Sequence, residues 1–586
     1  MSVNVIYGCK FDRVVYRLSV SFFVLATIFM LFATPVTQAQ TVDPLVKYIR
    51  LLQNDTTFTG TKSSFFISPY SKLRTQNLKL ISPWQDRFSE QDHPQRLFAF
   101  YTPIIKVGSN SEVAFGQNDG AMWQGRGLNT ALSFGGRFEY GPIEVSFRPQ
   151  FGYSENQDFD LAPNPPFFTF PFELSEYAQG LARIDQPQRF GEESISWFHP
   201  GQSWIRLSQW GAAAGVSTAN QWQGPALYNP LMMSNNAPGF FHAFLESDGP
   251  VTTPIGKLEA RWFWGGLQES DYFNDDPTNN LRFITGLTAA FSPSLLEGLH
   301  VGFSRSFYEN YPDDGLSAGN IFRVFQPFSE DRFSEQVEID VINQETPQRF
   351  QGDVAVRMLS FFGRYEVPEY GFEVWAEWGK NDNSFDNRNI LREPVHTRSY
   401  VLGLMKRFDL AGHRWLVADA EITQMENMED IKSNNYPVWY EHHNIKQGFT
   451  HQGQVVGAGI GPGSNSQQFR VTLYDEWGLA GLSLNRVINN NDRLFRHYPH
   501  ITSNQPLIGP RSHWTNQVPQ RAPLYDLHET EYRIGGQGVF FLPYHLELQL
   551  DVTVSLMYNR YNIYENDIRN VNTLMTLRFQ PPGFLR

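Results

Sequence analysis

Cysteine is nearly absent from this chain of 586 residues, and the only one, Cys9, lies close to the N-terminus. If an N-terminal segment is removed on export, the mature protein has neither a disulfide nor a reactive thiol. Positive charge is also scarce, because 47 lysines and arginines face 60 aspartates and glutamates, which gives a net charge of −13. A chain with this balance is poorly suited to neutralising phosphates, so nucleic acid is excluded as a partner.

Long apolar runs are missing after Ala39. The one such run, Leu18–Ala33, precedes a small-x-small motif that ends at Ala39. Basic residues come before the run: Lys10, Arg13 and Arg17. This order is typical of a secretory signal peptide, and we expect cleavage after Ala39. An uncleaved anchor is the alternative, but the run is shorter than the roughly 20 residues of a spanning helix.

Aromatic residues are abundant, with 49 phenylalanines, 25 tyrosines and 14 tryptophans. An exported, aromatic-rich chain of this length without helical spans belongs to one of two classes. One class is a large soluble β-protein, and the other is a transmembrane β-barrel. The spacing of the apolar residues distinguishes them.

Apolar and polar residues alternate strictly from His545 to Leu556. A strand points successive side chains to opposite faces, so one face here is apolar and the other polar. About 10 residues of this kind are typical of a lipid-facing barrel strand, whereas ordinary strands have about 5–6 residues. The pattern recurs in residues 143–148, 257–264, 372–378, 416–423, 468–473 and 570–579. The repetition predicts a closed barrel, because an open sheet edge would leave backbone groups unpaired in lipid.

Aromatic and charged residues of these strands predict what each face contacts. Aromatic residues near strand ends suit interfacial girdles, with aromatic-rich turns as the alternative: Tyr140, Trp204, Trp264, Trp378, Trp477 and Tyr558. Carboxylates at i, i+4 spacing, Glu373/Glu377 and Glu547/Asp551, are interpreted as part of an interior ladder of cross-strand ion pairs. The expected partners are arginines of neighbouring strands: Arg148, Arg206, Arg261, Arg357 and Arg578. A pair of carboxylates for glycan cleavage is the alternative reading.

The domain organisation follows from these patterns. We expect an all-β protein, a transmembrane antiparallel β-barrel of about 18 strands with a small N-terminal helical segment. The parts are a signal peptide at 1–39, an N-terminal helical or periplasmic segment at 40–96, the barrel at 97–579 and a C-terminal tail at 580–586. An amphipathic helix is predicted for Val42–Gln53. The last strand should end at Phe579, because Pro581 and Pro582 cannot donate to a ladder.

Motifs for catalysis and metal binding are weak. The densest histidine cluster, Glu441-His442-His443 with His451, lacks the spacing of a metal clamp, so we expect no metal and no cofactor. No Gly-x-Ser-x-Gly motif is present. A triad assembled from distant strands remains an alternative, but the sequence predicts a protein that is not an enzyme.

Two loop-like segments have a composition suited to ligands, Asn118–Gly127 and Gly215–His242. They combine glycines with tryptophan, arginine and planar amides, and sugars are recognised by an aromatic face together with amide hydrogen bonds. The equally weighted alternative is that these residues tile the inner wall of the barrel. The candidate residues for glycan or lumen contacts are Trp123, Arg126, Asn220, Trp222, Asn236 and His242.

Residues 48–53 (YIRLLQ), 118–127, 215–242 and 440–457 (YEHHNIKQGFTHQGQVVG) resemble, in this order, the capsule assembly protein Wzi family. The resemblance extends over nearly the whole mature chain. It implies an outer-membrane barrel of about 18 strands with an N-terminal helical bundle on the periplasmic side. It also implies lectin-like attachment and organisation of capsular polysaccharide, without known catalysis.

We therefore expect a monomer in the cell outer membrane that contacts outer-membrane lipid and binds surface or capsular polysaccharide. The alternative is a porin or a polysaccharide export channel. The two differ in the barrel interior: a lumen blocked by helices and loops favours attachment, and a continuous aqueous channel favours export.

Overall fold

The computed structural model describes residues 44–53, 83–84, 97–162, 184–274, 276–326, 355–381, 397–427, 438–442, 445–492, 528–579 and 584–585. The predicted signal peptide with Cys9, most of the predicted segment 40–96, and Pro581 and Pro582 lie outside these residues. Within the described part, no helix has the length and apolar character needed to cross a membrane.

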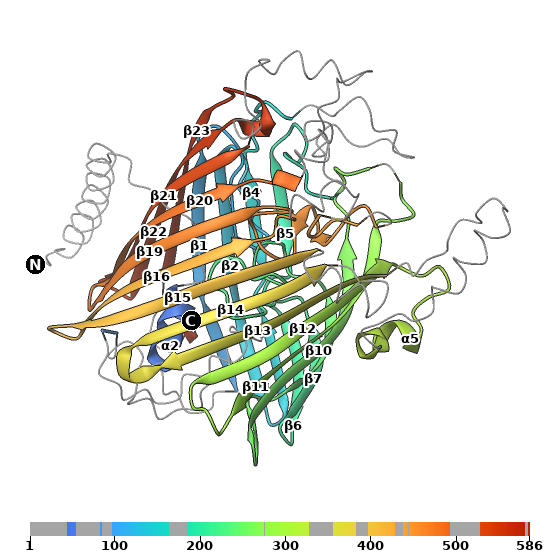
Figure 1. Cartoon of the computed structure of the whole chain (residues 1–586), viewed down its shortest axis with the longest axis vertical. Coiled ribbons are helices and arrows are strands. Elements are labelled where there is room, and N and C mark those ends of the chain that lie inside the picture. Colours follow the sequence, from blue (N-terminus) through green and yellow to red (C-terminus); the bar gives the residue numbers. More distant parts are fainter. Residues whose placement is uncertain are drawn as a thin grey trace, which may run out of the picture.

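The described strands form a closed antiparallel β-barrel of 18 strands, as predicted (Figure 1). The last long strand, β23, pairs with β1 and closes the barrel. Some barrel strands are interrupted. β3 and β4 lie end to end against β2, β6 and β5 pair with β3 and β4 as the next interrupted strand, and β8 and β9 lie end to end against β10.

The strand bounds are β1 (Phe98–Asn110), β2 (Gly127–Tyr140), β3 (Ile143–Phe147), β4 (Gln150–Ser154), β5 (Ile195–His199), β6 (Trp204–Gln209), β7 (Ala212–Ser217), β8 (His242–Ser247), β9 (Val251–Thr253), β10 (Gly256–Gln268), β11 (Leu281–Pro293), β12 (Leu299–Asn310), β13 (Val356–Val367), β14 (Phe372–Asn381), β15 (Arg398–Leu410), β16 (Arg414–Gln424), β19 (Asn465–Asp475), β20 (Gly478–Ile488), β21 (Thr530–Leu542), β22 (Leu546–Tyr558) and β23 (Ile568–Phe579). Two short strands, β17 (Thr450–His451) and β18 (Gln454–Val455), pair with each other outside the barrel sheet.

The alternation predicted for residues 545–556 is present in β22. Glu547, Gln549 and Asp551 are buried on the inner face, while the leucines between them are partly exposed on the outer face. An outer face of partly exposed apolar side chains is what lipid contact requires.

The predicted aromatic girdle is confirmed in part. Tyr140, Trp378, Trp477 and Tyr558 are exposed on the barrel surface. The prediction for Trp204 was wrong, because its indole Nε1 donates to Oε1 of Glu144 at 2.7 Å. Trp204 therefore lies on the inner face.

The two ends of the barrel differ in the length of their connections. At one end the turns are short, as at Gly141-Pro142 between β2 and β3 and at Glu476-Trp477 between β19 and β20. At the other end the connections are long, such as 218–241 between β7 and β8 and 425–464 between β16 and β19. Outer-membrane barrels have short periplasmic turns and long extracellular loops, which gives the long-loop end an outward orientation.

The helices of the described chain are short: α2 (Pro44–Gln53), α5 (Ala318–Ile321), η1 (Phe322–Phe325), η2 (Pro368–Tyr370) and η4 (Arg560–Asn562). Helix α2 confirms the helix predicted for Val42–Gln53, although Val42 lies outside the described residues. It lies within the barrel (Figure 1), where Tyr48 stacks on Trp415 and Tyr474 beside the short turns. Helix α2 therefore occupies the short-turn mouth of the barrel.

The C-terminal tail returns to the barrel. Strand β23 ends at Phe579, as predicted. It pairs with residues 104–110 of β1, and β24 (Phe584–Leu585) then pairs in parallel with Phe100 and Tyr101 of the same strand. The tail thus covers backbone groups of β1 that β23 leaves unpaired, which protects a sheet edge.

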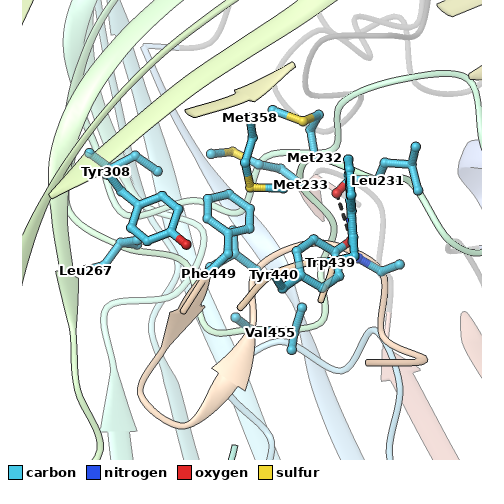
Figure 2. Close-up of a cluster of buried hydrophobic side chains, with 14 of the residues drawn as sticks. Leu231, Met232, Met233, Leu267, Tyr308, Met358, Trp439, Tyr440, Phe449 and Val455 are labelled. Atoms are coloured by element: carbon cyan, nitrogen blue, oxygen red, sulfur yellow. Dashed lines mark hydrogen bonds between the residues drawn. The ribbon is translucent and has the colours of Figure 1, made fainter. Parts of the chain in front are cut away.

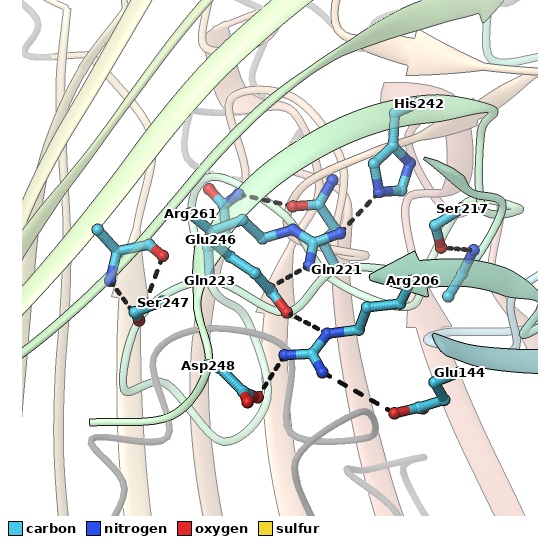
Figure 3. Close-up of polar contacts among 12 residues, drawn as sticks. Glu144, Arg206, Ser217, Gln221, Gln223, His242, Glu246, Ser247, Asp248 and Arg261 are labelled. Atoms are coloured by element: carbon cyan, nitrogen blue, oxygen red, sulfur yellow. Dashed lines mark hydrogen bonds and ion pairs between the residues drawn. The ribbon is translucent and has the colours of Figure 1, made fainter. Parts of the chain in front are cut away.

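The predicted interior ladder of ion pairs is present in part. Arg578 pairs with Glu547 at 2.6 Å. Arg206 and Arg261 both pair with Glu246, at 3.1 and 2.5 Å (Figure 3). These guanidinium groups neutralise buried carboxylates across neighbouring strands.

Other members of the ladder were predicted wrongly. Arg357 lies on the outer face, because its neighbour Met358 points into the barrel core. Asp551 accepts hydrogen bonds from Gln537 and Gln549 at 3.0 and 2.6 Å. The carboxylates of β14, which include Glu373, instead hold segments that enter the lumen.

Candidate functional site

Helix α2 is fixed to the barrel wall by buried charge pairs. Lys47 pairs with Asp419 of β16, and Arg50 pairs with Glu373 of β14. Arg50 also donates to the carbonyl of Pro225 at 2.7 Å. Burial lowers the pKa of the Lys47 ammonium, and Asp419 opposes this shift. Arg50 therefore ties the helix both to the wall and to the loop that contains Pro225.

The long connection 218–241 folds into the barrel lumen. Backbone amides of Leu227, Tyr228 and Asn229 donate to the carboxylate of Glu421 at 2.6–3.1 Å. The amide of Leu231 donates to Glu377, which also accepts from a serine hydroxyl of β13. Interior carboxylates thus satisfy backbone donors of a loop that would otherwise be unpaired inside the barrel.

A second connection, described at 438–442 and 445–464, packs on the first. Tyr440 donates from its hydroxyl to the Leu231 carbonyl at 2.7 Å, and Asn236 donates from Nδ2 to the Val455 carbonyl at 2.9 Å. Leu231, Met232, Met233, Phe449 and Val455 belong to one buried apolar cluster with inward residues of the wall (Figure 2). The barrel lumen is filled at this level by packed side chains.

A cavity of about 250 Å³ lies at the long-loop end, beyond the apolar cluster. Its lining comes from loops and strand ends far apart in sequence. The polar and aromatic lining residues are Gln117, Trp123, Gln186, Gln188, Asn236, Gln454, Ser464, Asn489, Asn490, Glu529, Glu531, Arg533, Tyr561 and Asn562. A wall of amides, aromatic rings and a few charges is suited to a hydroxyl-rich ligand.

Several buried polar atoms of the lining residues have no hydrogen-bond partner among the described residues. They include Nε1 of Trp123, a donor, and Oε1 of Gln186, an acceptor. Buried polar atoms are normally paired, so such a donor and acceptor are available to a ligand. The Trp123 ring packs on Phe190, with 4.6 Å between ring centroids, which fixes its orientation.

The charged lining residues are held by other groups. Arg533 donates to Glu531 and to Oε1 of Gln117, at 2.6 and 3.0 Å. Glu529 accepts from Asn489 at 3.0 Å and from the backbone amide of Tyr561 at 2.7 Å. These bonds preorganise the lining before a ligand enters.

A hydrogen-bonded polar cluster, formed by Asp185, Glu269, Ser270 and Gln447, joins the loops that form the cavity wall. Asp185 accepts from the amide and hydroxyl of Ser270 at 2.8 and 2.5 Å, and Gln447 donates to Glu269. Burial, with a contribution from the Asp185 carboxylate and against the opposing effects of Gln447 and Arg282, raises the pKa of Glu269 to about 7. Gln186 lines the cavity and directly follows Asp185, so this polar cluster fixes the position of the cavity wall.

Glu269→Gln should remove a pH dependence of stability. The raised pKa means that the folded protein holds this proton more tightly than the unfolded chain, so its contribution favours folding at low pH and is lost as pH rises through about 7. The melting temperature of the wild-type protein should therefore rise when the pH is lowered from 8 to 5.5, and it should rise less in Glu269→Gln. Glu565→Gln, in an exposed loop, is the control, and its melting temperature should depend on pH as that of the wild type does. The same dependence of melting temperature on pH in all three proteins would contradict the role of Glu269.

The candidate residues predicted from sequence separate into two groups. Trp123 and Asn236 line the cavity, and Arg126 lies at the outer rim, where it donates to the Ser111 and Asp158 carbonyls at 3.1 and 2.5 Å. Both amide functions of Asn236 are already used within the protein. Trp123 is thus the cavity-lining candidate that has a buried polar atom, Nε1, without a partner among the described residues.

The other three candidates hold the protein together. Asn220 donates to the Ala237 carbonyl at 2.8 Å, and Trp222 donates to the Ala226 carbonyl at 3.1 Å. His242 is fully buried and contacts Arg261 at 2.9 Å (Figure 3). His242 lies on the inner wall in β8, whereas Asn220 and Trp222 belong to the connection 218–241 inside the lumen.

Most of the lining residues could not be selected from the sequence. Gln186, Gln454, Asn489 and Glu529 belong to three different connections, and no motif joins them. A weak signal was available, since amides are frequent immediately after several strands at the long-loop end. In the histidine cluster, His451 accepts from the amide of Gln268 at 3.0 Å, and burial lowers its pKa to about 3.

A model of the family named capsule assembly protein Wzi matches residues 99–505. Among solved structures, the chain is similar to Wzi of Escherichia coli, an outer-membrane protein involved in group 1 capsule assembly and a carbohydrate-binding β-barrel. The identity is 12% and the TM-score 0.56, over 93% of this chain and 100% of that chain. At this identity the similarity shows the fold alone.

Two other solved structures are less similar. OprB of Pseudomonas putida is 10% identical, with a TM-score of 0.34 over 82% of this chain and 94% of that chain. OprD of Pseudomonas aeruginosa is 7% identical, with a TM-score of 0.35 over 83% and 95%. No curated protein matches the sequence of this chain.

Proposed function

Because the chain belongs to the capsule assembly protein Wzi family, we propose that it binds and organises surface or capsular polysaccharide. The protein is an outer-membrane β-barrel of this family. The proposed binding is lectin-like and does not involve catalysis. The observation that carries the proposal is the amide- and aromatic-lined cavity at the long-loop end of a barrel whose lumen is filled.

The filled lumen supports attachment over transport. An aqueous pore needs a continuous polar path, whereas the loops 218–241 and 438–464 meet in a buried apolar cluster inside the barrel. Helix α2 occupies the short-turn mouth through buried ion pairs. A porin or export channel would have to displace both layers.

The orientation of the cavity also supports the proposal. Its lining residues belong to the long connections, which face the exterior in outer-membrane barrels. Trp123 offers an aromatic face and a donor, and the surrounding amides offer both donors and acceptors. This combination fits the C–H faces and hydroxyl groups of a sugar.

The proposal is tested by polysaccharide retention. A deletion strain should release capsule into the medium, and complementation with the full-length gene should restore cell-bound polymer. Purified full-length protein immobilised in detergent should retain the strain's own polysaccharide, and the same protein should show little ion conductance in planar bilayers. Normal capsule attachment in the deletion strain, or a large steady conductance without polymer retention, would favour a transport function.

A further inference from the structure

The charged side chains that line the cavity at the long-loop end are paired within the protein. Arg533 donates from Nη2 to Oε2 of Glu531 at 2.6 Å and from Nη1 to Oε1 of Gln117 at 3.0 Å. Its guanidinium group also lies over the ring of Phe115, 4.7 Å from the ring centroid. Glu531 and Arg533 are 1% and 7% exposed, so each charge is compensated by the other rather than by solvent.

The third charged residue of the described lining, Glu529, is held in a similar way. Its carboxylate accepts from Nδ2 of Asn489 at 3.0 Å and from the backbone amide of Tyr561 at 2.7 Å. Burial lowers the pKa of the nearby Arg560 guanidinium, and Tyr561 and Glu529 oppose this shift by electrostatic attraction. Each of the two lining carboxylates therefore has a guanidinium partner.

The rest of the polar lining is uncharged. It consists mainly of side-chain amides, from Gln117, Gln186, Gln188, Asn236, Gln454, Asn489, Asn490 and Asn562. An amide offers both donors and an acceptor, as sugar hydroxyl and acetamido groups do, whereas a carboxylate only accepts. The cavity, about 250 Å³, is also smaller than the roughly 300–1,000 Å³ of pockets for drug-sized ligands, so it suits a short stretch of polymer.

We propose, on the premise that the protein binds polysaccharide, that the cavity selects uncharged sugar units and rejects units that carry a carboxylate, such as uronic acids. The selected class comprises neutral hexoses and N-acetylated sugars, which exchange water for hydrogen bonds to the amides. A uronate would lose the hydration of its charge and approach Glu529 and Glu531, while Arg533 is already engaged. The pair Glu531–Arg533 is thus the element that sets the selectivity.

The test uses fragments of the polysaccharide that the purified full-length protein retains. One portion is carboxyl-reduced, so that every uronic acid becomes a neutral sugar. A second portion is oxidised at its primary hydroxyl groups, which become carboxylates. Calorimetry with the detergent-solubilised protein should show that the reduced fragments bind at least about tenfold more tightly than the oxidised fragments, because like charges placed side by side repel.

Substitutions of the pair should change this selectivity in a defined direction. Glu531→Gln leaves the Arg533 guanidinium without its counterion, so the oxidised fragments should bind about tenfold more tightly than they bind the wild type. Glu531→Gln/Arg533→Gln removes both charges and should return the selectivity toward that of the wild type. Glu476→Gln, an exposed residue in a short turn at the opposite end of the barrel, is the control and should keep both wild-type affinities.

The outcomes separate this selectivity from polysaccharide binding itself. Equal or tighter binding of the oxidised fragments by the wild type overturns the selectivity and leaves polysaccharide binding intact, and this comparison decides even if a variant does not fold. Loss of affinity for both kinds of fragment in folded Glu531→Gln, without a gain for the oxidised ones, shows that the pair only supports the loop. Failure of the wild type to retain any polymer overturns both proposals.

Discussion

Arg50→Ala is expected to lower the stability of the folded protein by about 3–5 kcal/mol, the usual cost of removing one partner of a buried ion pair. Arg50 donates from Nε to Glu373 at 2.8 Å and from Nη1 to the Pro225 carbonyl at 2.7 Å, and its guanidinium lies 4.9 Å from the Trp375 ring centroid. The substitution leaves the fully buried Glu373 carboxylate without its cation. Helix α2 and the loop at Pro225 should both loosen.

The effect is measured by denaturant unfolding of the detergent-solubilised protein and by protease cleavage near residue 50. The double variant Arg50→Ala/Glu373→Gln should recover part of the loss, because it removes the unpaired charge. Arg126→Ala serves as the control, since Arg126 and Glu112 form an exposed pair at 4.0 Å, and such pairs contribute about 0–1 kcal/mol. Equal effects of Arg50→Ala and Arg126→Ala would show that α2 is not held by this pair.

The barrel itself could be predicted from sequence because its outer face has one uniform environment. Lipid contact requires apolar residues at every second position, and β22 displays this from Leu546 onward. The helix at Pro44–Gln53 was predicted for a similar reason, as one side packs on apolar surface. The spacing of apolar residues indicates what one face of an element contacts, and both β22 and α2 have a clear apolar face.

The inner face was harder to predict because the lumen is not uniformly polar. Val356 and Met358 point inward and are apolar, since they contact the cluster formed by the two lumen loops. The polar residue between them, Arg357, therefore faces outward, where a rule based on an aqueous lumen places apolar residues. Residue type is equally misleading for Trp204, an aromatic residue that faces inward and hydrogen-bonds to a carboxylate.

The cavity could not be derived from sequence, because its residues are brought together only by the folding of several long connections. Trp123 was selected by composition and does line the cavity, but Trp222 was selected by the same criterion and donates to the Ala226 carbonyl within the lumen. Composition identifies residues that are able to bind a sugar. Only the path of the chain separates those that face the cavity from those that hold a loop.

Trp123→Ala is expected to weaken polysaccharide binding by about 2 kcal/mol, or about 30-fold in Kd, as for a buried aromatic hot spot. The substitution removes both the aromatic face and the buried Nε1 donor that has no partner among the described residues. Affinity is measured by calorimetry with fragments of the polysaccharide that the purified protein retains. Trp210→Ala is the control, because Trp210 is 94% exposed in a short turn at the opposite end of the barrel.

Trp123→Phe separates binding from support of the loop. A phenylalanine ring can still pack on Phe190, which lies 4.6 Å from the Trp123 ring centroid, but it has no N–H group. If the indole donates to a sugar hydroxyl, Trp123→Phe should lose only the hydrogen bond, about 0.5–1.5 kcal/mol, and fall between the wild type and Trp123→Ala. If Trp123 only supports the loop, Trp123→Phe should bind like the wild type, and loss of affinity in Trp123→Ala should be accompanied by a matching loss of thermal stability.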